Sequence, residues 1–209
     1  MFLLSIDKEI TVRTFHPDDA EELFNLLERN RSRLRPWIHP TALPETPRAT
    51  RKFTIECYFG SLDPMVAIDT PYIDEVGSYF PPFNPAMEMG IWVNGSLAGE
   101  VALSWLNDSP AVAEFGYWLA EDFERKGIIT RCVRALMDHT IDHMDIEQFL
   151  IGSALNNQRS RAVPERLGYR LHATVPNGEV VGEFIYDRVV YGIRSTAWRQ
   201  QNKADVHNE

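Results

Sequence analysis

The spacing of apolar side chains predicts a series of short strands and helices along the chain. Alternation predicts a strand over 9–15, and apolar residues three and four positions apart predict a helix over 16–30. A second helix is expected over 46–60, where Pro47 suits the first helical position. Residues 61–87 follow neither period and carry several prolines and aromatics. A stretch of this length is typical either of a lid or binding loop or of a surface excursion.

From residue 88 onward the strand signals are stronger. Asn94-Gly95 divides 88–105 into the two arms of a hairpin, and a third strand is expected over 112–120. The remaining pattern predicts a helix over 128–144, a strand over 147–155, a short helix over 156–168 and strands over 169–175 and 182–194. This order indicates one mixed α/β (α+β) domain over 1–198, followed by a polar tail over 199–209 that we expect to be disordered.

Composition and charge narrow the class of protein. The chain has 209 residues, 44% of them hydrophobic, and no apolar run near the ~20 residues of a membrane helix. The first ten residues lack the basic leader and the apolar length of a secretory signal, so we expect a cytoplasmic protein with no membrane partner. A net charge of −9 argues against nucleic-acid binding and is compatible with cationic partners such as amines.

The two cysteines do not form a disulfide framework. Cys132 falls on the apolar face of the predicted 128–144 helix, so we expect a buried thiol. His139 and His143 are four residues apart on the same helix, a spacing that suits a metal. No third ligand is evident, and a solvated helix face is the favoured interpretation. We therefore expect no metal.

The stretch "FERKGIIT" (123–130) places Arg125, Lys126 and Gly127 immediately before a predicted helix. The first turn of a helix has unpaired N–H groups and a partial positive charge, so it suits a phosphate group. Thr130 adds a hydroxyl group. The alternative is an ordinary turn that needs a flexible residue. A preceding strand and a following strand that ends in "ALNNQRS" favour a ligand site, because ligands bind at such strand ends.

Two segments carry a family resemblance. "AEFGYWLAEDFERKGIITRCV" and "NNQRSRAVPERLGYRL" resemble the acetyl-coenzyme A motifs of the GNAT N-acetyltransferase superfamily, and most of all its RimJ/RimL-type branch. The resemblance implies a central, mostly antiparallel twisted sheet of about six to seven strands flanked by helices. It also implies acetyl-CoA as co-substrate, an amine acceptor (a protein N-terminus or a small molecule) and a homodimer.

The resemblance assigns the cofactor site residue by residue. The family pattern Gln/Arg-x-x-Gly-x-Gly/Ala is met here only at Gly127, since Glu124 and Ile129 replace the other two residue types. Backbone amides do not depend on side-chain identity, so they can still bind the pyrophosphate. Glu124 must point away from the phosphates, because like charges would otherwise repel each other. The residues implied for cofactor binding are Trp118, Leu119, Arg125, Lys126, Gly127, Ile128, Ile129, Thr130 and Asn157.

The catalytic groups also follow from the resemblance. Glu114 matches the general base of this branch, although an exposed residue of an alternating strand is its ordinary interpretation. Pro164 stands where many GNAT enzymes have a tyrosine acid, and Ser160 matches the serine of the RimJ/RimL-type enzymes. Ser160 would then stabilise the departing thiolate, or it would cap the following helix. Trp37 and Trp105 are expected to line the acceptor cleft, although core packing explains Trp105 equally well.

These expectations lead to one main hypothesis and two alternatives. The main hypothesis is an acetyl-CoA-dependent transferase that acetylates a primary amine, by direct attack in a ternary complex, because the motifs contain no nucleophilic cysteine. The first alternative keeps the reaction but takes a small amine, such as an antibiotic or an aminoacyl nucleotide. The second is a non-catalytic acyl-CoA-binding module, which the changes at Glu124 and Ile129 favour and the retained Glu114 and Ser160 oppose.

Overall fold

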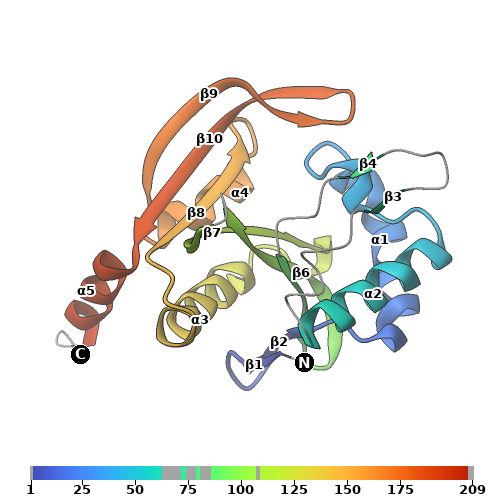
Figure 1. The fold of residues 1–209 in the computed structure, drawn as a ribbon, viewed down its shortest axis with the longest axis horizontal. Coiled ribbons are helices and arrows are strands. Elements are labelled where there is room, and N and C mark those ends of the chain that lie inside the picture. Colours follow the sequence, from blue (N-terminus) through green and yellow to red (C-terminus); the bar gives the residue numbers. More distant parts are fainter. Residues whose placement is uncertain (1, 63–71, 74–78, 81–85, 107–108, 207–209) are drawn as a thin grey trace.

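One open sheet of eight strands organises the chain (Figure 1). The computed structural model describes residues 2–62, 72–73, 79–80, 86–106 and 109–206. The strand order is β1-β2-β5-β6-β7-β8-β10-β9, and every neighbouring pair is antiparallel except β7 and β8. The strands are β1 (Leu3–Ser5), β2 (Ile10–Thr14), β5 (Ala86–Val93), β6 (Ser96–Leu106), β7 (Ser109–Leu119), β8 (Gln148–Ala154), β9 (Arg170–Val181) and β10 (Phe184–Arg194).

Five helices accompany the sheet: α1 (Ala20–Leu34), α2 (Pro47–Leu62), α3 (Ile128–His143), α4 (Gln158–Arg166) and α5 (Ser195–Val206). Each strand and helix predicted from the sequence is present, which confirms the mixed α/β class. The sheet has eight strands where about six to seven were expected, because β1 pairs with β2 at the edge. Three residues of β1 are too few for a periodic signal.

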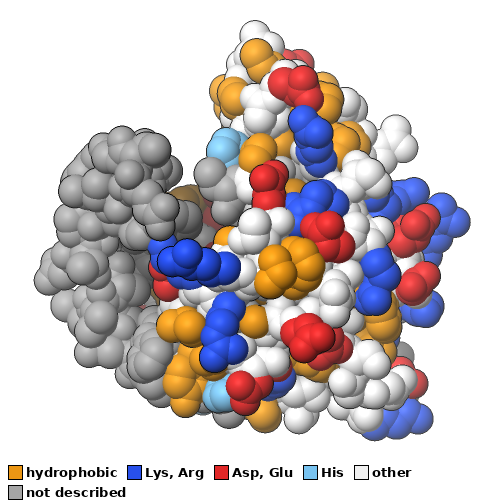
Figure 2. Space-filling model, turned by 90° about the vertical axis from the view of Figure 1, so that its right-hand side faces the viewer, with side chains coloured by type: hydrophobic (Ala, Val, Ile, Leu, Met, Phe, Trp, Pro, Cys, Tyr) orange, Lys and Arg blue, Asp and Glu red, His pale blue; other side chains and the backbone are white. Residues whose placement is uncertain are grey.

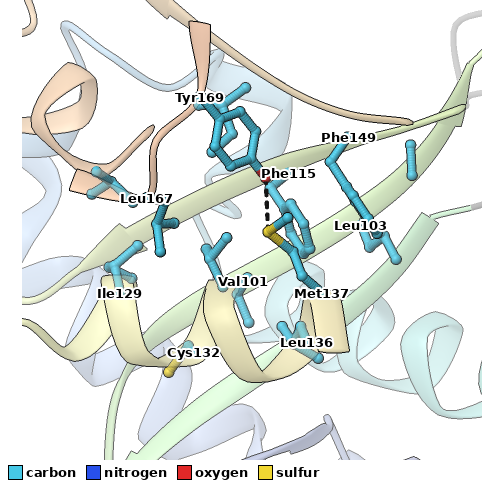
Figure 3. Packing of buried hydrophobic residues seen from close by; sticks show 14 of the residues in the cluster. Val101, Leu103, Phe115, Ile129, Cys132, Leu136, Met137, Phe149, Leu167 and Tyr169 are labelled. Atoms are coloured by element: carbon cyan, nitrogen blue, oxygen red, sulfur yellow. Dashed lines mark hydrogen bonds between the residues drawn. The ribbon is translucent and has the colours of Figure 1, made fainter. Parts of the chain in front are cut away.

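Helix α3 and the strands beneath it form the larger core. Its apolar face packs on one side of β6, β7 and β8, in a core that includes Cys132 and Leu136, and Figure 3 shows the Met137 side chain directed at Phe115. The hydroxyl group of Tyr169 donates a hydrogen bond of 3.1 Å to the Met137 sulfur. Cys132 is fully buried, as predicted, and burial raises the pKa of its thiol to about 12.

Helices α1 and α2 pack on the β5–β6 part of the sheet and enclose a second core, which contains Phe15, Trp92 and Trp118. Strand β7 separates the two cores because its side chains alternate between the faces. Phe115 belongs to the larger core, whereas Trp118 belongs to the second one. Gly116 and Trp118 therefore share the face that α1 and α2 approach.

The hairpin of β9 and β10 extends beyond the body and arches toward the C-terminal end of α1 (Figure 1). At its turn Tyr186 stacks on Trp37, with ring centroids 5.6 Å apart, and Arg35 lies 3.3 Å from Glu183. Most side chains of β9 are exposed. The hairpin is therefore fixed at both ends, by the sheet on one side and by aromatic stacking on the other.

The C-terminal segment is helical further than the sequence indicated. Helix α5 runs from Ser195 to Val206, so the expected boundary after residue 198 falls inside it. The indole N–H of Trp198 donates to Asp138 at 2.6 Å, and Arg199 forms an ion pair with Asp142 at 2.7 Å. These contacts with α3 give the polar segment tertiary partners that its own pattern does not reveal. Residues 207–209 lie outside the described residues.

The irregular 61–87 segment falls mostly outside the described residues. The structure describes two short strands in it, β3 (Tyr72–Ile73) and β4 (Tyr79–Phe80), which pair with each other. The choice between a lid and a surface excursion is therefore not decided. In the part of the chain that the structure describes, no helix is long and apolar enough to cross a membrane.

Candidate active site

The site begins where β7 and β8 separate. These parallel strands pair at only three positions, from Val112↔Gln148 to Glu114↔Leu150. Beyond Glu114, β7 stays paired with β6, and β8 stays paired with β10. A cleft of about 980 Å³ opens beside the separated strands, and Gly116 and Ser153 are among its lining residues. Strands that part in this way leave backbone N–H and C=O groups without a sheet partner, which suits an amide-containing ligand.

The N-terminus of α3 lies in the wall of this cleft. Gly127, at the N-cap, has a φ of 69°, and Arg125 two residues earlier has a φ of 61°. Gly127 has no side chain with which to cap the helix, so the first-turn N–H groups receive no hydrogen bond from the N-cap side chain. Residues 125–130 all line the cleft. The arrangement is a positively polarised helix end with basic side chains beside it, which suits a diphosphate.

Glu114 occupies the point where the two strands part. Its Oε1 accepts hydrogen bonds from the Gly152 N–H at 3.0 Å and from Arg188 at 2.5 Å. Gly152 is needed for this approach, because a Cβ there would lie 2.5 Å from Oε1 of Glu114. Arg188 also lies 3.4 Å from Glu179, a residue of the cleft wall. The Glu114 carboxylate is therefore held in place where the two strands part, and Glu114 is not among the residues that line the cleft.

Comparison with known proteins agrees with this geometry. Residues 9–170 match the family described as the acetyltransferase (GNAT) domain. The chain belongs to the GNAT acetyltransferase family. The "Putative ribosomal N-acetyltransferase YdaF" of Bacillus subtilis (strain 168) is 31% identical over 198 residues, which cover 95% of this chain and 98% of YdaF. The family therefore spans nearly the whole chain.

Two solved GNAT structures with bound coenzyme A compounds share the fold. The microcin C7 self immunity acetyltransferase MccE, in complex with acetyl-CoA and AMP, has a TM-score of 0.75 and 22% identity over 90% of this chain and 94% of its own. RimL, a ribosomal L7/L12 alpha-N-protein acetyltransferase in complex with coenzyme A, has a TM-score of 0.76 and 21% identity over 92% of this chain and 98% of its own.

The two departures from the GNAT phosphate-loop pattern are accommodated in different ways. The Glu124 carboxylate is bridged by Arg33 and by Arg159, whose Nη1 lies 2.8 Å from Oε2. Arg33 also donates to the Leu119 carbonyl oxygen, which occupies one backbone group of β7. Ile129 is buried in the larger core, so its side chain does not enter the cleft. Neither residue therefore presents an unbalanced charge or bulk to a diphosphate.

The strand after the cleft leads into Asn157 and Ser160. Asn157 is the N-cap of α4, and its side-chain oxygen accepts from the Ser160 N–H at 3.2 Å. The capping role considered for Ser160 therefore belongs to Asn157. The Tyr117 hydroxyl group donates to the Ser160 carbonyl oxygen at 3.0 Å, and burial raises the pKa of Tyr117. Asn157 and Ser160 both line the cleft, together with Trp118 and Leu119.

The tryptophans and histidines separate into cleft residues and others. Trp37 is 37% exposed and lines the cleft, whereas Trp105 packs against the larger core and does not line it. His139 and His143 stack on the surface of α3 with ring centroids 4.2 Å apart. Within the described residues, no three side chains of the types His, Cys, Asp or Glu form a metal-binding group.

Several cleft residues were missed by the sequence analysis. Arg33 belongs to the basic run "RNRSRLRP", which reads as an ordinary solvated turn. Glu88 and Glu100 also line the cleft, from β5 and β6. Their signal was available, because each is the single charged residue of an otherwise uncharged strand. Burial raises the pKa of both carboxyl groups, and that of Glu100 more strongly.

Proposed function

We propose that this GNAT protein transfers the acetyl group of acetyl-CoA to a primary amine, with the α-amine of a protein N-terminus as the first candidate acceptor. The observation that carries the proposal is the separation of β7 from β8 beside the uncapped N-terminus of α3. One cleft thereby contains a diphosphate-binding helix end and unpaired strand backbone. The names of YdaF and RimL, both ribosomal acetyltransferases, support the choice of acceptor.

The cofactor-binding assignment follows the cleft walls. The backbone N–H groups of 125–130 hold the diphosphate, with Arg125 and Lys126 adding positive charge. The backbone of Trp118 and Leu119 runs beside the pantetheine arm, and the Asn157 side chain donates to it. Acetyl-CoA supplies an activated acetyl group as a thioester. The protein's part is to orient that thioester and the amine for direct attack in one ternary complex.

Glu114 and Ser160 are the proposed catalytic groups. Attack on the thioester carbonyl carbon forms a C–N bond, breaks the C–S bond and releases one proton from the amine. Glu114 takes that proton through a water molecule, and Arg188 holds its carboxylate where β7 and β8 part, next to the cleft residue Gly152. The Ser160 hydroxyl group donates a hydrogen bond to the departing sulfur. Ser160 lines the cleft from the first turn of α4.

The test measures binding and turnover separately. A saturating concentration of acetyl-CoA should raise the melting temperature, because it binds only the folded state. Release of the CoA thiol should then be measured with N-terminal peptides of ribosomal proteins and with a panel of small amines. Turnover of the peptides supports the proposed acceptor. Turnover of small amines alone supports the small-molecule alternative, for which MccE, solved with acetyl-CoA and AMP, provides a structural precedent.

Two other results would contradict the proposal. An unchanged melting temperature would remove acetyl-CoA as the ligand. A raised melting temperature without thiol release, across both peptides and small amines, would support the non-catalytic acyl-CoA-binding module.

Cellular location and assembly are part of the same proposal. A ribosomal acceptor and acetyl-CoA both support a cytoplasmic location. The β9–β10 hairpin exposes Leu171, Val175, Val180 and Ile185, a row of apolar side chains that supports a homodimer. The molar mass in solution, measured by light scattering, tests this: a single species near the 24.0 kDa of one chain would contradict the dimer.

A further inference from the structure

Two acidic side chains enter the cleft from the sheet face that α1 and α2 approach. The strand register places Glu88 opposite Ala102 and Ala102 opposite Gly116. One row further along, Glu100 lies opposite Trp118. Side chains of directly paired residues share one face, so both glutamates border the small side chains at 102 and 116.

The surface over Gly116, on the strand next to Ala102, is open. Among the described residues, a Cβ built at Gly116 would meet one atom within 4 Å, the Cβ of Ala102 at 3.9 Å. Ala102 and Gly116 both line the cleft, as do Glu88 and Glu100. A ligand atom above Gly116 therefore lies beside β7, within reach of both carboxyl groups.

Glu88 and Glu100 lie close enough to influence each other, and burial raises the pKa of both carboxyl groups, that of Glu100 more strongly. Trp118 donates its indole N–H to Oε2 of Glu100 at 3.1 Å. Glu88 is therefore the first of the two to ionise as the pH rises, and its carboxylate places a negative charge in the cleft.

Nothing positive among the described residues balances that charge. No ion pair between described residues includes Glu88 or Glu100. Helix α2 brings Cys57 toward them, and its thiol has a pKa raised by burial and by both carboxyl groups. A buried negative charge without a counter-charge is costly, unless a ligand supplies one.

The cleft is therefore electrically divided. Its α3 end has an excess of positive groups, since Arg33, Arg125, Lys126, Arg159 and Arg166 line it with Glu124 as their neighbour. Acidic groups lie in the other region, beside Gly116, where Glu88 and Glu100 enter the cleft. A diphosphate fits the first region and a cation fits the second.

We infer that Glu88 and Glu100 form the binding site for the protonated amine of the acceptor, and that they select amines without a neighbouring carboxylate. This inference rests on the proposed function and names the group that recognises its acceptor. The Glu88 carboxylate accepts hydrogen bonds from the ammonium group above Gly116, and Glu100 holds Glu88 in position. The proton is removed afterwards, by the base of the proposed reaction.

The selectivity follows from charge. The α-ammonium group of a peptide, or of an amino-acid amide, has no carboxylate beside it and presents only its positive charge to the pair. A free amino acid has a carboxylate beside the amine, which the pair repels at a short distance and in a cleft that screens poorly. The site therefore favours peptide N-termini and aminoacyl conjugates over free amino acids.

The test uses the substitutions Glu88→Gln and Glu100→Gln, each of which keeps side-chain size and removes the charge. Glu56→Gln is the matched control, because Glu56 lies on α2 with a 59% exposed side chain. KM should be measured for acetyl-CoA and for two acceptors, a serine-initiated pentapeptide amide and phenylalaninamide. We expect Glu88→Gln to raise the KM of the amine about tenfold or more while the KM of acetyl-CoA changes less than about twofold. Phenylalanine should be a much poorer acceptor than phenylalaninamide for the wild type, and the difference should shrink in Glu88→Gln.

A second measurement does not depend on turnover. Calorimetry should show tighter binding of the pentapeptide amide than of its N-acetylated form to the wild type, and Glu88→Gln should lose that preference. An amine KM and a peptide preference that match those of Glu56→Gln would overturn the inference. If the wild type binds the free peptide selectively through Glu88 but releases no thiol, the proposed function fails and the amine site stands.

Discussion

The Nη1 of Arg159 lies 2.8 Å from Oε2 of Glu124, and Arg33 pairs with the other oxygen of the same carboxylate. An acidic residue at the start of the phosphate loop is thus neutralised by two cations, one from α1 and one from α4. The three side chains connect α1, the loop and α4 across the cleft mouth. This bridge explains how the loop keeps a glutamate beside the proposed diphosphate site.

Glu124→Gln should strengthen CoA binding. The substitution removes a negative charge next to the α3 N-terminus and frees two arginines to face the phosphates. We expect the Kd for CoA to fall about three- to fivefold, with a smaller change at high salt. Calorimetry at two salt concentrations measures this. Glu121→Gln is the control, because Glu121 has an exposed side chain on the same segment. Unchanged or weaker binding in Glu124→Gln would show that the carboxylate is needed to position the arginines.

Gly127→Ala should reduce both stability and cofactor affinity. The φ of 69° at Gly127 disfavours any side chain, although no atom lies within 4 Å of a Cβ placed there. We expect a loss of about 1 kcal/mol in the free energy of unfolding, measured by urea denaturation. Gly95→Ala provides a matched control in the β5–β6 turn, where φ is 81° and the Cβ is equally free of contacts. It should cost a similar amount but leave the Kd for CoA unchanged. Equal Kd values for CoA in Gly127→Ala and Gly95→Ala would show that Gly127 is not part of the ligand site.

Glu114→Gln should reduce turnover far more than acetyl-CoA affinity. Loss of a general base lowers kcat about a hundredfold or more, whereas the distant diphosphate contacts remain. Steady-state kinetics and calorimetry give the two quantities. Equal losses in both would contradict the proposed base. Glu179→Gln removes the other partner of Arg188. An equal loss of kcat in that variant would mean that Arg188, and not Glu114, is responsible.

Stability should depend on pH through Glu100. Burial and the neighbouring Glu88 raise its pKa well above the ordinary 4.5. Between the ordinary and the raised value, the folded state keeps a proton that the unfolded state has lost, so the free energy of unfolding falls as pH rises. For each unit by which folding raises the pKa of Glu100, the free energy of unfolding falls by about 1.4 kcal/mol once the pH exceeds the pKa of the folded state.

Glu100→Gln removes this cost and can still donate a hydrogen bond to Glu88. We expect its melting temperature to exceed that of the wild type at about pH 8, with a difference that shrinks toward about pH 4.5. Thermal melts across this range test the prediction, with Glu56→Gln as the control. A difference that is independent of pH would show that Glu100 does not titrate in the folded state.

The distribution of charge on the surface bears on partners. On the side of the molecule that carries α1 and α2, acidic and basic side chains are interspersed (Figure 2). The visible face thus has no large basic area among its described residues. The expectation that nucleic acid is not the partner, drawn from a net charge of −9, stays a prediction.

The sequence by itself determined most of the elements and the position of the candidate ligand site along the chain. Apolar periodicity is a local property, so it predicted β2, the strands from β5 to β10 and the helices from α1 to α4. A glycine before a helix marked the α3 N-terminus for the same reason, because N–H groups of a first turn need no distant partner. The family resemblance added Glu114 and Ser160 as proposals for catalysis.

Only the tertiary structure decided which distant side chains meet. Arg33 reaches Glu124 across 91 positions of the chain, and Arg188 reaches Glu114 across 74. The proximity of Glu88 and Glu100 depends on the register between β5 and β6, and their raised pKa values depend on burial beneath α2. Long-range contacts, strand register and desolvation depend on the packed fold as a whole. No local pattern of residues specifies them.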